Sequence, residues 1–225
     1  MFKQLMKIWS GKSLLSQMSE DFLGMLVDGR YMFQELTDRW IAGEEISSTK
    51  QKFYDVDHNI NLQQQRIRRR IVEHLTVNPK SDIPASLILM SVVKDAERIG
   101  DYCKNMFEAV ELLVPGQGPE EDLKQLFAIR EQILEMMNLS VDSFREQDES
   151  RARKIIETNG PLAKLCDRYV DGYMATDKTF RNIVAYALIF RYYKRIAGHL
   201  TNIASTVVLP IDQIDYYDED HDPKM

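Results

Sequence analysis

Apolar and polar residues alternate along most of this chain with the period of an α-helix. From Leu89 to Leu113, apolar side chains recur at steps of three and four residues, which places them on one helix face. No segment shows the period-two alternation that is typical of a half-buried strand. The pattern predicts an all-α protein with helices at 16–41, 47–75, 81–113, 120–145, 149–174 and 178–209.

Helix-breaking residues separate the predicted helices. Gly43 and the pair Asn78-Pro79 mark turns, and the strongest break is the sequence PGQGP at 115–119. Helices of about 25 to 30 residues that are joined by short connections pack as antiparallel neighbours.

The two halves of the chain resemble each other. A shift of 97 residues places Arg98 on Arg195 and Asn105 on Asn202, and it superposes the apolar runs LILMSVV and VAYALIF. This repeat predicts an internal duplication, two tandem antiparallel three-helix bundles. The predicted domains are residues 1–115, which include an N-terminal segment, residues 119–209, and an acidic tail at 210–225.

Charge is concentrated in the tail. The 225 residues carry 29 Lys and Arg against 35 Asp and Glu, a net charge of −6, and the tail alone holds six of the acids and one lysine. The body is therefore nearly neutral, which disfavours a generic nucleic-acid binder. The tail has too few apolar residues for a core of its own, so we expect it to lie outside the second bundle's core.

The cysteines and the N-terminal segment indicate the cellular compartment. Two cysteines cannot form a disulfide scaffold, which fits a reducing compartment. The N-terminal segment carries lysines among its apolar residues and lacks the centre of a signal peptide, and no apolar run approaches membrane-spanning length. We expect a cytoplasmic protein.

Four oxygen-bearing side chains form a candidate metal site. Glu97 and Asp101 are one helical turn apart, and Asp57 and Asn61 have the same spacing on the preceding helix. If these helices pack antiparallel, the four side chains meet. Such oxygen donors suit iron, manganese, magnesium or calcium.

A second reading of the same residues needs no metal. Arg98 and Lys94 lie on the same helix and could supply the counter-charge through salt bridges. None of the four histidines follows a glutamate by three residues, so the ferritin-like di-iron class is excluded. Nucleophile triads and phosphate loops are also missing from the sequence, and we expect no enzymatic activity.

Arginines gather at residues 66–70, in the sequence RIRRR. One reading is a solvent-exposed helix face paired with Glu73. The alternative readings are a surface for an acidic partner, a phosphate or an anionic headgroup. A nucleic-acid-binding helical protein is a third functional hypothesis, weakened by the nearly neutral body.

The string ERIGD at 97–101, preceded by Asp57 and Asn61, resembles the PhoU family of phosphate-transport regulators over residues 16–209. The resemblance implies a non-enzymatic regulator of phosphate uptake or signalling, in contact with a membrane phosphate transporter or an associated signalling protein. It implies no nucleic-acid partner and leaves a homodimer and proximity to the membrane open. Some members carry metal clusters, so one divalent or iron centre is expected at Asp57, Asn61, Glu97 and Asp101.

The second half departs from the family pattern. Where a second ERIGD is expected, this chain has KRIAG at 194–198. The preceding helix offers Asn159 and Ala163 if the connecting loop is allowed to differ in length between the halves. We therefore expect no metal in the second half. The alternative function is a metal-binding helical-bundle protein with its carboxylate site in the first half and no transporter partner.

Overall fold

The computed structural model describes residues 14–77, 82–177 and 180–215. These residues form long α-helices and no strand, which confirms the all-α prediction. The helices are α2 (Leu14–Ala42), α3 (Lys50–Val77), α4 (Ile83–Glu111), α5 (Glu120–Glu146), α6 (Glu149–Ala175) and α7 (Ile183–Val208), with the short 3-10 helix η1 (Ser47–Thr49) before α3.

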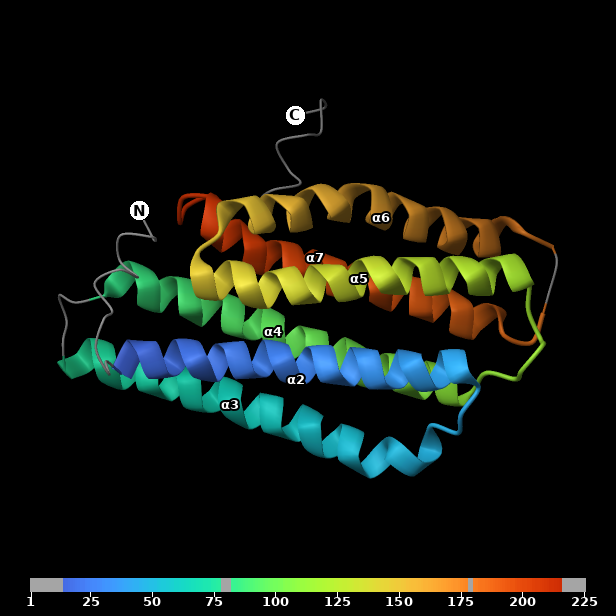
Figure 1. The fold of residues 1–225 in the computed structure, drawn as a ribbon, viewed down its shortest axis with the longest axis horizontal. Coiled ribbons are helices and arrows are strands. Elements are labelled where there is room, and N and C mark those ends of the chain that lie inside the picture. The colour runs from blue at the N-terminus through green and yellow to red at the C-terminus, as the bar shows by residue number, and fades with distance from the viewer. Residues whose placement is uncertain (1–13, 78–81, 178–179, 216–225) are drawn as a thin grey trace.

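The helices form two sets of three. Helices α2, α3 and α4 pack against one another, and α5, α6 and α7 form the second set, which lies alongside the first (Figure 1). Helix α4 packs against α7 and α2 against α5, so the buried apolar side chains of all six helices join in one cluster. The tandem three-helix bundles are confirmed, and they share one hydrophobic core. The exact domain boundaries stay a prediction.

Local chemistry explains where several helices begin and end. After α2, Gly43 has a φ of +68°, in the left-handed region that glycine adopts without a steric penalty. Before α6, the carboxylate of Asp148 accepts hydrogen bonds from two backbone N–H groups of the first turn. The predicted turn at Asn78-Pro79 lies outside the described residues.

Asn182 fixes the start of α7 against the linker between the two halves. Its side chain accepts from the Val114 N–H at 3.0 Å and donates to the Val114 carbonyl at 2.8 Å. Its own N–H donates to the Gln117 carbonyl at 3.2 Å. The prediction that this helix begins at 178 is wrong, because Asn182 is committed to the linker and the helix begins at Ile183. Residues 178 and 179 lie outside the described part.

Replacing Asn182 with alanine should lower the free energy of unfolding by about 1–3 kcal/mol, because it leaves both polar groups of Val114 without their partner. Denaturant unfolding followed by circular dichroism measures the change. Asn138→Ala is the matched control, since Asn138 makes an exposed hydrogen bond to Arg30 and should cost less than about 0.5 kcal/mol. Equal losses in the two variants would contradict this role for Asn182.

The described start of the tail folds back onto α4 and α7. The Ser91 hydroxyl donates to the Asp215 carboxylate, and the Asp215 N–H donates to the Ser205 hydroxyl, each at 3.4 Å. Burial raises the pKa of Asp215, and the negative charge of Asp95 raises it further. The tail therefore begins against α4 and α7, and residues 216–225, like the N-terminal residues 1–13, lie outside the described part.

None of the described helices combines the length and the apolar character needed to cross a bilayer.

Candidate functional site

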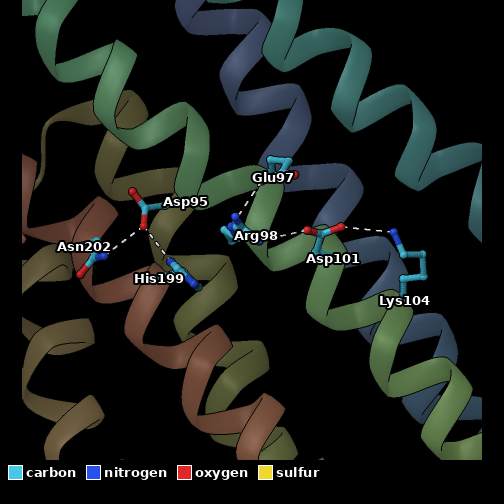
Figure 2. A network of polar contacts seen from close by, with 7 residues as sticks. All are labelled: Asp95, Glu97, Arg98, Asp101, Lys104, His199 and Asn202. Atoms are coloured by element: carbon cyan, nitrogen blue, oxygen red, sulfur yellow. Dashed lines mark hydrogen bonds and ion pairs between the residues drawn. The ribbon is translucent and has the colours of Figure 1, made fainter.

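An ion-pair cluster joins α3 and α4 at the predicted metal site. The Lys104 ammonium donates to Asp57 Oδ2 at 2.9 Å and to Asp101 Oδ1 at 3.2 Å. The Arg98 guanidinium lies 3.5 Å from Asp101 Oδ2 and 3.8 Å from Glu97 Oε2. Figure 2 shows the α4 part of this cluster, which runs along the helix from Glu97 to Lys104. Three carboxylates and two cations thus neutralise most of one another's charge.

The predicted metal ligands are only partly brought together. Asp57, Glu97 and Asp101 lie in the ion-pair cluster, whereas Asn61 makes no hydrogen bond or ion pair to them in the described residues. The Lys104 ammonium bridges Asp57 and Asp101. In the part of the chain that the structure describes, no group of three or more His, Cys, Asp or Glu side chains is arranged to hold a metal ion. As arranged, these donors fit an ammonium group, and the metal centre stays a prediction.

The counter-charge comes partly from an unexpected residue. Arg98 pairs with Asp101, as the sequence suggested, but the second cation is Lys104 and not Lys94. Lys94 instead acts electrostatically on Asp215. Lys104 follows Asp101 by three residues, a spacing at which helical side chains meet, but Lys94 precedes Glu97 by the same spacing, so the sequence offers both lysines.

Burial and charge shift two pKa values in the ion-pair cluster. Burial raises the pKa of Glu97, and the charge of Asp101 adds to the shift. Burial by itself would lower the pKa of Lys104, but its hydrogen bonds to Asp57 and Asp101 outweigh that effect, so the pKa is raised. Lys104 therefore stays protonated and acts as a permanent cation in this cluster.

The Glu97→Gln variant should be more stable than the wild type near neutral pH, by a few tenths of a kcal/mol, roughly the size of one like-charge pair on a helix. The folded state raises the Glu97 pKa above its ordinary value of 4.5, so it binds the proton more tightly than the unfolded chain does. Ionisation of Glu97 therefore weakens the fold as the pH rises through this window.

Thermal unfolding of both proteins near neutral pH and below about pH 4 measures this effect, since Glu97 is protonated in both states at the lower pH. The stabilising effect of the variant should vanish there. Glu157→Gln, on an exposed side chain within α6, is the control and should be neutral at both pH values. A gain of equal size at both pH values would contradict the charge argument.

Glycine in the ERIGD string allows α3 and α4 to approach closely. A Cβ atom at Gly100 would lie 3.0 Å from Ile60 Cδ1 and 3.9 Å from Asp57 Oδ1. The small residue therefore lets the α3 carboxylate come within reach of the charged groups on α4.

A buried carboxylate forms a second polar centre, between the two halves. Asp95 of α4 is fully buried, and its Oδ1 lies 2.8 Å from His199 Nδ1 and accepts from Asn202 Nδ2 at 3.0 Å (Figure 2). The tautomer of His199 with its proton on Nδ1 donates a hydrogen bond to this carboxylate oxygen. The other oxygen, Oδ2, is buried with no partner in the described residues. The ring of Tyr102 stacks on His199 with 5.6 Å between centroids.

No pattern in the sequence points to this centre. Asp95 is separated from His199 by 104 positions and from Asn202 by 107, and neither pair shares a motif.

The basic stretch at 66–70 has a different ion-pair partner from the expected one. Arg70 pairs with Asp21 of α2 at 2.7 Å and not with Glu73, because α2 packs against this side of α3.

The fold and these two centres define a duplicated helical-bundle protein whose halves are joined through a buried carboxylate. The family model described as PhoU domain matches residues 15–110 and 128–207, one stretch in each half. The chain therefore belongs to the PhoU domain family.

Two curated relatives carry the name phosphate-specific transport system accessory protein PhoU homolog. The protein from Aquifex aeolicus is 28% identical over 145 residues, which span 62% of this chain and 65% of that protein, just under two thirds of its length. The protein from Synechocystis is 24% identical over 174 residues, or 71% of this chain and 73% of that protein.

Solved structures show the same fold. The phosphate transport system regulatory protein PhoU from Streptococcus pneumoniae superposes with a TM-score of 0.73 at 22% identity, covering 86% of this chain and 93% of that one. PhoU from Pseudomonas aeruginosa gives 0.67 at 21% identity, with 92% and 97% covered. At these identities the likeness concerns the fold.

Proposed function

We propose that this protein is a non-enzymatic regulator of phosphate uptake or phosphate signalling. It acts by protein–protein contact with a membrane phosphate transporter or its signalling partner. The observation that carries the proposal is the match of the PhoU domain to both halves of the chain. The names of the Aquifex and Synechocystis relatives, accessory proteins of a phosphate-specific transport system, support it.

The polar centres are consistent with a binding protein. In the ion-pair cluster, Lys104 and Arg98 engage the carboxylates, and the buried carboxylate of Asp95 holds His199 and Asn202 at the contact between α4 and α7. The ion-pair cluster holds α3 against α4, and the Asp95 centre holds α4 of the first half against α7 of the second, which is what a rigid docking surface needs. A cytoplasmic location, where the inner face of a transporter is accessible, belongs to this proposal.

Phosphate uptake in cells tests the proposal. The coding sequence is deleted from the native host and restored on a plasmid, and uptake of radiolabelled phosphate is measured at low and high external phosphate. We expect deletion to abolish the dependence of uptake on external phosphate and the plasmid to restore it. An unchanged dependence in the deletion strain would reject a regulatory role.

The partner is tested separately. The tagged protein is cross-linked in cells and purified from solubilised membranes, and the bound proteins are identified by mass spectrometry. A phosphate permease, a sodium–phosphate cotransporter or its signalling kinase should be enriched over an untagged control. Enrichment of none of these would contradict the transporter contact. Light scattering of the purified protein determines whether it also forms a homodimer.

The metal-binding alternative has its own experiment. One divalent or iron centre at Asp57, Asn61, Glu97 and Asp101 requires that purified protein retain metal and that the Glu97→Ala/Asp101→Ala double variant lose it. Elemental analysis of the two proteins decides between these functions. Equal metal content in both would remove these residues from any metal site.

A further inference from the structure

A polar pocket of about 220 Å³ opens between α6 and α7 in the second half. Lys194 and Gly198 correspond to the predicted metal ligands Glu97 and Asp101 under the shift of 97 residues. Asn159 and Ala163 correspond to Asp57 and Asn61 when the connecting loop of the second half is allowed a different length. None of the described lining residues is acidic. The lining consists of Asn159 and Ala163 from α6 and of Lys194, Arg195, Gly198, His199 and Asn202 from α7.

Positive charge at this pocket comes from neighbouring residues of α7. The Arg195 side chain is exposed and has no ion pair in the described residues. Lys194 pairs with Asp167, an aspartate that lies outside the lining. His199 has its Nδ1 engaged by Asp95, which leaves Nε2 as the ring nitrogen available to a ligand.

A buried hydrogen-bond acceptor also lines the pocket. Asn159 is only 5% exposed, and its Oδ1 has no hydrogen-bond partner in the described residues. A buried acceptor of this kind is costly unless a donor satisfies it. Beside it, a Cβ atom at Gly198 would meet nothing within 4 Å, so the space at this position is open.

We propose that this pocket binds inorganic phosphate. Lys194 and Arg195 balance the charge of the oxyanion and donate hydrogen bonds to its oxygens. At neutral pH inorganic phosphate keeps at least one P–OH group, and this group donates to the unpartnered Oδ1 of Asn159. Sulfate has a similar shape but no such proton, so the site distinguishes the two anions.

Phosphate binding at this pocket deepens the proposed function and rests on it for its regulatory meaning. His199 and Asn202 line the pocket and also bind Asp95 of α4, so a ligand there contacts the same residues that join the two halves. Binding of phosphate would in this way change the contact between α4 and α7 as the phosphate concentration rises.

Isothermal titration calorimetry on the purified full chain tests the inference, with phosphate or sulfate added at constant ionic strength. We expect saturable binding of phosphate that is about 3- to 10-fold tighter than that of sulfate, the contribution of one hydrogen bond. Lys194→Gln and Arg195→Gln should each weaken phosphate binding about tenfold or more, because each removes a charged donor. Arg69→Gln, on the exposed surface of α3, is the matched control and should bind as the wild type does.

Two further variants separate the roles of the lining residues. Asn159→Leu should abolish the preference for phosphate over sulfate, because it removes the acceptor for P–OH. Asp167→Asn should tighten phosphate binding, because it releases Lys194 from its competing carboxylate. Thermal unfolding of each variant confirms that it is folded before titration.

Three results would overturn the inference: no saturable phosphate binding by the wild type, equal affinity in the wild type and the Lys194 and Arg195 variants, or sulfate binding as tight as phosphate binding. These results are independent of the uptake experiment. If uptake depends on the protein but the purified chain binds no phosphate, the pocket assignment fails and the regulatory function stands.

Discussion

Replacing Asp95 with alanine is expected to lower the free energy of unfolding by about 2–4 kcal/mol. The carboxylate is fully buried and accepts hydrogen bonds from His199 and Asn202, so its removal leaves two polar side chains of α7 without their acceptor. Because these bonds cross from one half to the other, we also expect the unfolding transition to broaden or divide as the halves lose their coupling. Denaturant unfolding monitored by circular dichroism measures both effects.

A double-mutant cycle isolates the Asp95–His199 interaction. The variants Asp95→Ala, His199→Ala and their combination should show a coupling energy of about 1–3 kcal/mol, because each single change removes the same contact. Asp55→Ala is the matched control, since Asp55 is exposed on α3 and, within the described part of the chain, accepts a hydrogen bond only from Gln51. Additive effects within about 0.5 kcal/mol would show that the two residues stabilise the fold independently.

Replacing Lys104 with methionine is expected to cost about 1–3 kcal/mol. Methionine keeps the apolar part of the side chain, so the loss reports on the ammonium group that bridges Asp57 and Asp101. Without it, two carboxylates remain close together, and among the described residues Arg98 is the one remaining cation paired with Asp101. The free energy of unfolding is measured by urea denaturation at low and high salt, and the loss should be smaller at high salt because screening weakens the repulsion.

The same variant links the ion-pair cluster to the metal question. If Lys104 supplies the cation that a metal would otherwise supply, Mg²⁺ or Mn²⁺ should raise the melting temperature of Lys104→Met but not that of the wild type. Lys124→Met is the control, because Lys124 makes an exposed ion pair on α5. Neither Mg²⁺ nor Mn²⁺ should raise the melting temperature of this variant. Equal stabilisation of the wild type and Lys104→Met would contradict the idea that lysine and metal compete for one position.

Corresponding positions in the two halves carry different charges. In the first half, carboxylates from α3 and α4 meet at Lys104, a cation supplied by the chain itself. In the second half, the corresponding positions carry Lys194 and a glycine, and a polar pocket remains. The two halves are therefore similar frameworks with different charges at corresponding positions: the carboxylates of the first half bind Lys104 of the chain itself, and in our proposal the second half binds an anion.

Sequence by itself determined the helices and the duplication, because both depend on local patterns. The three- and four-residue spacing of apolar side chains reports on one helix at a time, so five of the six predicted helices begin and end within about three residues of their positions in the structure. The closeness of Asp57, Glu97 and Asp101 was also predictable, since paired spacings on adjacent antiparallel helices leave few arrangements. The choice of Lys104 over Lys94 was not, because it depends on which side of α4 faces α3.

Only the tertiary structure decided how the halves meet. Three features join residues that are far apart in the sequence or on different helices. They are the pairing of Asp95 with His199, the hydrogen bonds of Asn182 to the linker, and the pocket around Asn159. Sequence periodicity identifies the face that a helix buries but not the partner that covers it. The partner is set by the packing of the whole bundle, and for that reason the centres that couple the two halves of this protein became visible only in three dimensions.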